Sequence, residues 1–487
     1  MGLMTRRELL ENSMLAAAAA VTLGGTNSLF AEDKQSGSPN EKLRIAVVGV
    51  NSRGGEHLSQ YLARKDVEVV AICDTDTDVG MSKGVARVAK ESGKKPAFFQ
   101  DLRKMLDASN GIDCVSIATP NHWHALAAIW SIQAGKDVYV EKPVSHNVSE
   151  GRRIVEAARK YGKICQTGTQ CRSMGATIEA VDYAKSGEIG EVKVARGLCY
   201  KPRGSIGPRG TYEPPKSVDY DVWCGPAPMH ALTRPKFHYD WHWQWDYGNG
   251  DLGNQGIHQM DIARWGLGVD DVGGAVLSYG GRFAYTDAGE TANSQVSIHD
   301  YGDKTLVFEV RGLKTDAYKT AGVGVIFEGT DGYVVLTSYD RGAAFDKNGN
   351  KVKEFSAQGD HFGNFIDAVR SRKVDSLKAD ILEGHLSSAL CHLGNISYRL
   401  GETVTVAEAR ERLGAMKQKA EATETFDRFL SHLTGNGLDA EKLPLTLGAA
   451  LTLDAKAEVF TGAQSDKANT MLSREYRKGF EVPTSFA

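Results

Sequence analysis

Short apolar runs that do not alternate with polar residues recur in the first third of the chain. They lie at residues 43–49, 67–74, 113–119 and 137–143, and a stretch with helical spacing follows the first of them. Continuous runs of this length are typical of parallel strands that are buried on both faces of a sheet. The pattern therefore predicts an α/β fold that begins with a doubly wound parallel sheet.

Beyond residue 190 several runs alternate apolar and polar residues, as strands of a sheet with one covered face do. A Gly- and Pro-rich excursion at 200–235 interrupts them, and we expect it to form a loop over a site. Helices are expected at 361–369 and 381–400. The strands are expected at 191–200, 272–279, 295–301, 305–311, 324–328 and 333–337.

The N-terminal segment has the features of an export signal rather than of a folded element. The pair Arg6-Arg7 precedes an apolar stretch at 14–23, which is too short to span a membrane. We predict a twin-arginine signal peptide at 1–31, and an ordinary secretion signal is the alternative. A linker is expected at 32–41. We therefore expect a periplasmic or other extracytoplasmic location. No membrane anchor is expected, because no Cys follows the apolar stretch to carry a lipid.

Composition narrows the class of protein. The 487 residues are 41% hydrophobic and 24% charged, which suits a globular chain of two or three domains. A net charge of −3 gives no reason to expect a nucleic-acid partner. The seven Cys form no C-x-x-C pair, and no run of His and Cys has the spacing of metal ligands, so no metal is expected.

The first strand runs into the turn Gly49-Val50-Asn51-Ser52-Arg53-Gly54, then a helix and a strand that ends at Asp74. This order is the dinucleotide-binding fingerprint, with Asp74 placed to bind the adenosine ribose. Asp74 favours NAD over NADP, while Arg53 leaves NADP open; alternatively Asp74 only caps a turn. Asn51 stands where the middle glycine is usual and tolerates the left-handed conformation. The expected cofactor contacts are Gly49, Asn51, Ser52, Arg53, Gly54 and Asp74.

Polar residues also follow the third and fourth predicted strands. Ligands of doubly wound sheets bind at the carboxyl ends of the strands, where these residues would lie. We therefore add Thr119, Pro120, Asn121, His124, Glu141 and Lys142 to the expected cofactor contacts.

The run at 240–265 carries three Trp at alternate positions, several Gly, and then His258 and Asp261. Aromatic faces and an ionisable pair at a helix start suit a polyhydroxylated small molecule. The alternative is a buried aromatic cluster before an ordinary helix. We expect Trp243 and Asp261 to contact substrate. Gln170 and Arg172, just after the first domain, either reach the substrate too or only anchor the crossing between domains.

Together, Glu141-Lys142-Pro143, the loop from Thr119 to His124, and Gly256-Ile257-His258 with Asp261 resemble the glucose-fructose oxidoreductase/inositol dehydrogenase (Gfo/Idh/MocA) family. The resemblance extends from about residue 43 to 401. It implies an NAD-binding domain at 42–165 and a substrate domain at 166–400 with a large, mostly antiparallel sheet. The tail at 401–487 is expected to pack on the body or on a partner subunit of a homo-oligomer.

The resemblance also implies roles for single residues. Lys142 would bind the reacting oxygen and His258 would exchange the proton, tasks for which an ammonium and an imidazole are suited. Asn254 stands where relatives often have an aspartate, so the basicity of His258 would be altered if the two side chains meet.

Three functions remain open at this point. The first is an exported NAD-dependent oxidoreductase that acts on a carbinol of a sugar, glycoside or cyclitol and keeps its cofactor bound. The second is a glycoside hydrolase that oxidises, eliminates, adds water and reduces with the same NAD. The third is a non-catalytic sugar-binding protein, for which Asn254 is the best support.

Overall fold

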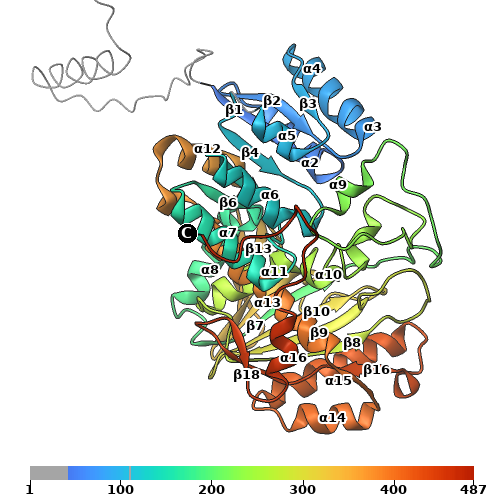
Figure 1. The fold of residues 1–487 in the computed structure, drawn as a ribbon. Helices are drawn as coiled ribbons and strands as arrows, with labels where there is room; N and C mark the ends of the chain where they lie inside the picture. The colour runs from blue at the N-terminus through green and yellow to red at the C-terminus, as the bar shows by residue number, and fades with distance from the viewer. Residues whose placement is uncertain (1–41, 109–110, 487) are drawn as a thin grey trace, which may run out of the picture. The chain divides into compact units, whose positions relative to one another are not determined.

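Six parallel strands form the first sheet of the protein, whose computed structural model describes residues 42–108 and 111–486 (Figure 1). Their order is β3-β2-β1-β4-β5-β6, so the chain reverses direction across the sheet between β1 and β4. A crevice forms at the carboxyl ends of the strands at such a reversal. The predicted doubly wound sheet is confirmed. The strands are β1 (Leu43–Val48), β2 (Val67–Cys73), β3 (Ala97–Phe99), β4 (Cys114–Ile117), β5 (Asp137–Val140) and β6 (Cys165–Thr167).

Helices cover both faces of this sheet. His122 and His124 belong to α6, which begins directly after Pro120, and not to the loop that the sequence suggested. A distant helix, α12 (His361–Ser371), also joins this domain, since Phe362 and Phe365 pack with Leu58 in its core. The other helices are α2 (Arg53–Leu62), α3 (Thr77–Val79), α4 (Ala86–Ser92), α5 (Leu102–Asp107), α6 (Asn121–Gln133) and α7 (Val148–Lys160).

The second sheet has twelve strands and is mostly antiparallel, as the family resemblance implied. Its main order is β14-β13-β12-β11-β7-β10-β9-β8-β16-β15, and β7 with β10 forms a parallel pair. The six strands expected from alternation are all present: β7 (Val192–Tyr200), β8 (Ala275–Gly281), β9 (Ser294–Asp300), β10 (Thr305–Arg311), β11 (Val323–Gly329) and β12 (Gly332–Ser338). The others are β13 (Arg341–Asp346), β14 (Lys351–Ser356), β15 (Glu402–Val404), β16 (Leu445–Leu447), β17 (Leu451–Asp454) and β18 (Val459–Thr461).

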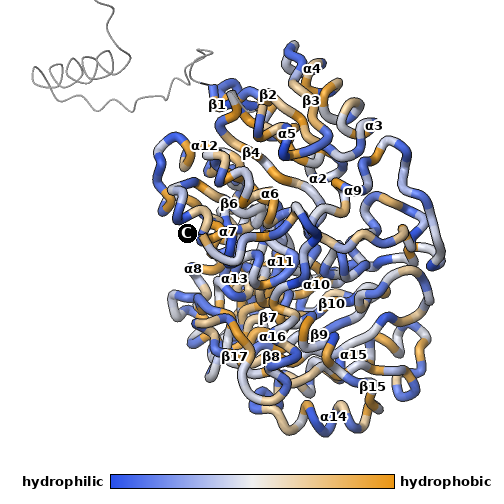
Figure 2. The backbone as a smooth tube through the Cα atoms, viewed as in Figure 1, coloured by the Kyte–Doolittle hydropathy of each residue, from blue (hydrophilic) through white to orange (hydrophobic). Residues whose placement is uncertain are grey.

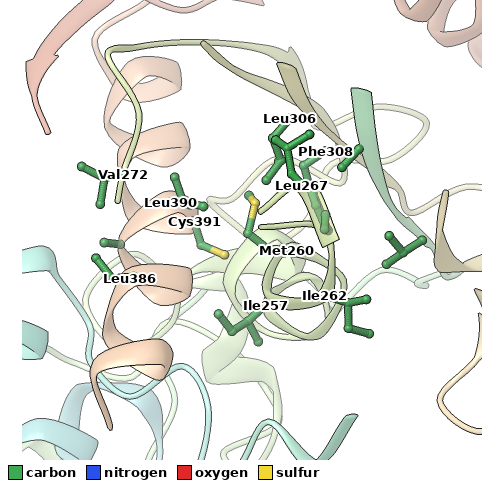
Figure 3. Close-up of a cluster of buried hydrophobic side chains, with 14 of the residues drawn as sticks. Ile257, Met260, Ile262, Leu267, Val272, Leu306, Phe308, Leu386, Leu390 and Cys391 are labelled. Carbon is green, nitrogen blue, oxygen red and sulfur yellow. The ribbon is translucent and has the colours of Figure 1, made fainter. Parts of the chain in front are cut away.

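Helices α8 (Gly175–Lys185), α11 (Gly256–Leu267) and α13 (Ile381–Arg399) cover one face of this sheet. Figure 3 shows Ile257 and Met260 of α11 pointing among side chains of α13 and β10, including Leu390 and Phe308. The opposite face is covered by α14 (Val406–Gly414) and α15 (Lys419–Gly435). Both β4 and β7 are drawn mainly as hydrophobic in Figure 2, because each is covered on two sides. The helix that carries His258 is therefore held between a sheet and a second helix.

The tail is built into the body of the protein. Strands β15 to β18 belong to the second sheet, and α16 (Ser465–Thr470) packs beside β18. Phe480 and Val482 then pack into the core of the first domain. The predicted signal peptide and linker lie outside the described residues. In the described part of the chain no helix is long and apolar enough to cross a lipid bilayer.

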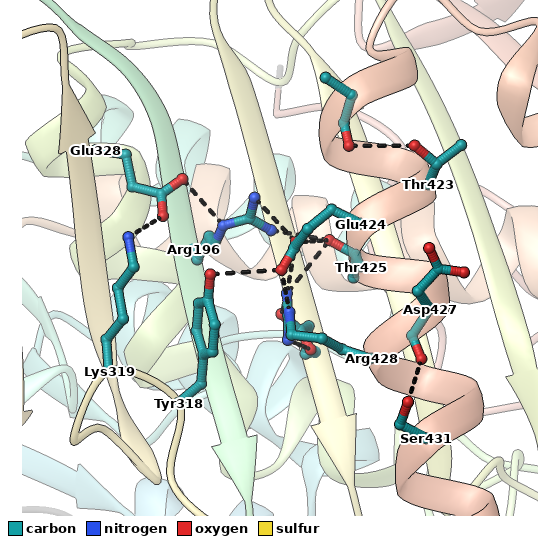
Figure 4. A network of polar contacts seen from close by, with 12 residues as sticks. Arg196, Tyr318, Lys319, Glu328, Thr423, Glu424, Thr425, Asp427, Arg428 and Ser431 are labelled. Carbon is teal, nitrogen blue, oxygen red and sulfur yellow. Dashed lines mark hydrogen bonds and ion pairs between the residues drawn. The ribbon is translucent and has the colours of Figure 1, made fainter.

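A buried charge network joins α15 to the second sheet. The carboxylate of Glu309, which is fully buried, accepts two hydrogen bonds of 2.7 Å from Arg428 and one of 2.8 Å from Tyr200. Glu424 binds the outer side of the same Arg428, and Arg196 reaches both Glu328 and Glu424 (Figure 4). Because a buried carboxylate is costly without partners, this network fixes α15 on the sheet.

We therefore expect Glu309→Gln to lower the free energy of unfolding by roughly 3–5 kcal/mol, because it leaves the buried Arg311 and the partly buried Arg428 without their shared counter-charge. Denaturant unfolding of the full chain measures this. Glu424→Gln is the matched control on Arg428: Glu424 is 41% exposed, and its loss should cost at most about 1 kcal/mol. Equal losses in the two variants would contradict the assignment of Glu309 as the buried anchor.

Candidate active site

A cavity of about 310 Å³ lies at the carboxyl ends of the first sheet's strands, where a nucleotide is expected. Its walls come from both domains, since residues between 201 and 255 close the side opposite the sheet. From the first domain the lining includes Gly49, Asn51, Ser52, Arg53, Asp74, Thr119, Pro120, Asn121, His124, Glu141 and Lys142; from the second it includes Lys201, Arg203, Trp223, His238, Tyr239, Trp241, His242, Asn254 and Gln255.

The glycine turn has the geometry that a bound diphosphate needs. Gly49 adopts φ +78°, and a side chain on Gly54 would collide with the Gly49 carbonyl oxygen at 1.8 Å. Ser52 has a positive φ of +50° with ψ −108°, which is not the left-handed helical conformation, and Asn51, where we expected that conformation, has no positive φ. The Asn51 side chain instead accepts a hydrogen bond of 2.7 Å from Lys83. The turn is thus closed with only two of the three usual glycines.

Asp74 lies at the end of β2 on the cavity wall. Its carboxylate accepts hydrogen bonds from the backbone N–H groups of Val50 (2.9 Å) and Asp76 (3.0 Å). Burial raises the pKa of Asp74, and these two donors oppose the shift. The contacts fix the carboxylate beside the glycine turn, where it is available to a ribose hydroxyl.

The rim between β4 and β5 contains an unpaired hydroxyl. Thr119 Oγ1 is buried, lines the cavity and has no protein partner among the described residues. His124 holds this rim together, because its ring nitrogens lie 2.7 Å from the Thr119 carbonyl oxygen and 2.5 Å from that of Pro143. Asn121 donates to Asn249 of the second domain at 3.1 Å. An orphaned donor beside a glycine turn and a fixed acid is what an NAD site requires, so these residues fit the cofactor.

The inner wall is organised by Glu141. This carboxylate is 3% exposed and accepts a hydrogen bond of 2.7 Å from Arg53 Nε. His57 Nε2 lies 3.1 Å away on the same oxygen. Burial by itself would raise the pKa of Glu141, but Arg53 and His57 hold it well below its ordinary value. Arg53 is therefore paired with a carboxylate. This pairing removes the main reason for considering NADP, which was that Arg53 could bind its 2′-phosphate.

Lys142 follows Glu141 and reaches across the cavity. Its ammonium donates a 2.9 Å hydrogen bond to the backbone carbonyl of Asn254. Burial lowers its pKa, and Glu141 opposes this shift. The amide side chain of Asn254 turns away to Asp251, at 3.4 Å, and no hydrogen bond between Asn254 and His258 occurs among the described residues. The contact that their four-residue spacing suggested is therefore not made, because Asn254 precedes α11 instead of lying within it.

His258 lies in the first turn of α11 and is 4% exposed. Its Nδ1 is 4.0 Å from Cys171 Sγ, and its ring centroid is 5.3 Å from that of Tyr339. Burial and then the charge of Lys142 lower the pKa of His258 well below its ordinary value. The imidazole is consequently neutral near pH 7 and able to accept a proton. It is not among the residues that line the cavity, although the nearby Asn254 and Gln255 are.

Asp261 and Arg172, which we expected near the substrate, bind each other and do not line the cavity. Asp261 is fully buried and accepts hydrogen bonds of 2.8 Å from Arg172 and 2.7 Å from Ser387. Arg172 also contacts Glu383 at 2.9 Å, and Glu383 pairs with Arg264. These residues lie off the cavity and anchor α11 to α13, so the geometry offers no substrate contact for either.

Trp243 and Gln170 are also placed away from the cavity. Trp243 packs with Ile206 and Ala288 below the Arg203 guanidinium, and Gln170 lines a separate depression beside Tyr339. Among the three alternate Trp, Trp241 lines the cavity, stacked on His242 with centroids 3.6 Å apart. The sequence pattern pointed to all three alternate Trp and singled out Trp243 instead of Trp241. It did not single out the cavity residues His242, Lys201, Arg203, His238, Tyr239 and Gln255, since only the fold brings these segments together.

Residues 201–249, which we call the cover segment, are fastened to the first domain. The backbone N–H of Thr77 donates to Ser217 (2.9 Å), and that of Asp219 donates to Thr75 (2.9 Å). His238 Nε2 lies 2.9 Å from Asp76 Oδ2. Figure 1 shows α9 (Tyr220–Cys224) on this segment beside the strand ends of the first domain. The loop that we expected over the site is therefore a latched cover.

Two family models match most of the chain. Residues 43–169 match "Oxidoreductase family, NAD-binding Rossmann fold", and residues 209–429 match "Oxidoreductase family, C-terminal alpha/beta domain". The chain belongs to the Gfo/Idh/MocA oxidoreductase family. These matches confirm the predicted family, fold class and NAD cofactor.

Curated relatives resemble only part of the chain. A "Glycosyl hydrolase family 109 protein 1" of Shewanella sp. (strain ANA-3) is 32% identical over 156 residues, which are 31% of this chain and 34% of that protein. An "Alpha-N-acetylgalactosaminidase" of Shewanella oneidensis is 32% identical over 156 residues, with the same coverage. The chain thus spans about a third of the length of these relatives.

Solved structures resemble more of the chain at lower identity. The WlbA dehydrogenase of Bordetella pertussis, solved with NADH and UDP-GlcNAcA, has a TM-score of 0.54 at 20% identity, over 72% of this chain and 96% of that one. A putative NADPH-dependent oxidoreductase of Desulfitobacterium hafniense has a TM-score of 0.57 at 17% identity, over 73% and 95%. At these identities the likeness establishes the fold.

The pKa of His258 gives a direct test of this arrangement. Lys142→Met removes a cation that disfavours the imidazolium, so the pKa should rise, yet stay below its ordinary value because burial persists. Histidine-selective NMR titration measures it, with His258→Gln identifying the signal. Lys83→Met, which removes a cation bound to Asn51 instead, should leave the pKa of His258 unchanged. An unchanged pKa in Lys142→Met would separate Lys142 from His258.

Proposed function

We propose that this protein oxidises a secondary alcohol of a sugar, glycoside or cyclitol and keeps its NAD bound between turnovers. The observation that carries the proposal is the Lys142 ammonium, which projects from the end of β5 to Asn254 inside the cavity. A cation at this point lies between the nucleotide site of the first domain and the start of α11.

The side chains divide the chemistry between them. Lys142 holds the reacting oxygen and stabilises the negative charge that develops there. His258, neutral because of its burial, accepts the hydroxyl proton, either directly or through a water molecule, since it does not line the cavity itself. Bound NAD supplies the hydride acceptor. Trp241 and His242 offer flat faces to the C–H surface of a sugar ring.

The cover segment supports retention of the cofactor. Its contacts at Thr75, Thr77 and Asp76 close the cavity over the strand ends, so a nucleotide can leave only when they open. Retention suits export in the folded state through the twin-arginine route that we propose for residues 1–31, because no NAD pool exists outside the cytoplasm to replace a lost cofactor. Cell fractionation tests this location, and a cytoplasmic mature protein would contradict it.

Freshly purified protein should accordingly carry about one NAD per chain. His238→Ala removes the partly exposed link to Asp76 and should speed NAD release roughly three- to tenfold, since such a bond contributes about 1 kcal/mol. Acid extraction and rapid dilution measure content and rate. His230→Ala, 63% exposed on the same segment, is the matched control. Protein free of nucleotide, or equal release from both variants, would count against the latched cover.

A glycosidase that recycles NAD is a second candidate, favoured by the relatives named for glycosidase activity. Oxidation of the sugar at C3 makes the C–H group at C2 acidic, so a base removes that proton as the glycosidic oxygen leaves C1. Water then adds to the anomeric carbon and the ketone is reduced again, which gives net hydrolysis without net redox change. Both candidates use Lys142 and His258 in the first step, and only the products distinguish them.

We expect Lys142→Ala to lower turnover by about 10²–10³-fold and His258→Ala by about 10²–10⁴-fold, with NAD content retained in both. Higher pH should partly rescue His258→Ala, because the hydroxyl then ionises more easily. The assay follows aryl glycosides for aglycone release, and hexoses and inositols for keto products, on the NAD-loaded protein. Aglycone without net NADH identifies the hydrolase. Unchanged turnover in both variants would contradict these two roles, whereas sugar binding without turnover of any substrate in the parent protein would leave the non-catalytic alternative.

A further inference from the structure

The end of the cavity around Lys142 carries more positive charge than negative. Four cationic side chains line it: Arg53, Lys142, Lys201 and Arg203. They lie close together, since Arg53 and Lys201 are both among the charges that lower the pKa of Lys142, after burial. The two lysines bind two residues that are adjacent in the chain. Lys142 donates to the Asn254 carbonyl (2.9 Å), and Lys201 donates to Gln255 Oε1 (3.3 Å).

The two guanidinium groups form ion pairs with carboxylates, and the two ammonium groups form none. Arg53 pairs with Glu141 at 2.7 Å, and Arg203 forms two bonds of 2.7 Å with Asp251. Within residues 42–108 and 111–486, neither Lys142 nor Lys201 has a carboxylate within 4.0 Å. Each is bonded to a neutral oxygen. A partly buried cavity with two cations that form no direct ion pair attracts an anion.

The chemistry accounts for one of these cations. Lys142 serves the oxygen that becomes negative, and the cofactor diphosphate has the glycine turn and the start of α2. Lys201 projects from the other domain, at the end of β7, and has no part in either task. Its surroundings are fixed: Arg203, Tyr239 and Asp251 are hydrogen-bonded together, and Arg203 stacks on Trp243. A fixed ammonium of this kind suits recognition of a charged substituent.

We propose that this site, if it acts on a sugar as proposed above, selects a sugar that carries a carboxylate, such as a hexuronic acid or its glycoside, and that Lys201 binds that carboxylate. The ring then lies between Lys201 and Lys142, against Trp241. A phosphate group carries a charge of roughly −1.5 to −2 near pH 7, more than the one ammonium of Lys201 balances, whereas a carboxylate carries a single charge. The carboxylate is therefore the better match for a single ammonium.

The test compares ligands that differ only at C6. Methyl β-D-glucuronide and methyl β-D-glucoside are titrated into the full, NAD-loaded protein by calorimetry, with glucose 6-phosphate as the phosphate arm. The glucuronide should bind roughly tenfold more tightly than the glucoside, the size of one charge-assisted hydrogen bond. Lys201→Met should bring the glucuronide affinity down to that of the glucoside in the same variant, whereas Lys201→Arg should retain the preference. Lys347→Met, at an exposed position away from the cavity, controls for total charge.

Each outcome bears on one claim. Equal affinity for the two glycosides, or a preference that survives Lys201→Met, overturns the carboxylate site while sugar oxidation stands. Tighter binding of glucose 6-phosphate than of the glucuronide overturns the carboxylate in favour of a phosphate. Loss of NAD from Lys201→Met with normal thermal unfolding assigns Lys201 to the cofactor and overturns the proposal. If neither glycoside binds or is turned over, the proposed function fails and this inference fails with it.

Discussion

The ion pair between Arg53 and Glu141 is the contact on which the rest of the site depends. It joins the first residue of α2, just after the glycine turn, to the end of β5, which carries Lys142. A carboxylate that is 3% exposed requires such partners, and His57 supplies a second one while bound to Ser116. The glycine turn and the Lys142 backbone are thus held at a fixed separation by one buried carboxylate.

A second buried network does the same for the other domain. Arg172, Asp261, Arg264 and Glu383 join α11 to α13, so the residues that looked like a substrate site are its support. His258 lies three residues from Asp261 on the helix that this network immobilises. Its neutrality follows from the burial that this packing imposes, and the proposed proton acceptor is positioned through the fold instead of by a neighbouring aspartate.

The sequence predicted whatever depends on local pattern. Continuous apolar runs located the parallel strands, alternation located six strands of the second sheet, and the turn before Gly54 located the nucleotide site. What it could not predict depends on tertiary contacts. The tail strands are three or four residues long and exist because the β8 edge is there to pair with. Trp241 and Lys201 face the cavity only because the cover segment folds back, and the i, i+3 spacing of His258 and Asp261 cannot tell which one is paired internally.

The central claim is that the cavity places a nicotinamide ring beside Lys142, at the junction with α11. A crystal structure of the full chain with NAD tests it most directly. The account predicts the adenosine ribose on Asp74, the diphosphate at the glycine turn and the nicotinamide ring in contact with the Lys142 side chain below the cover segment. NAD bound in the opposite direction, or a nicotinamide ring outside the cavity and remote from Lys142, would contradict it.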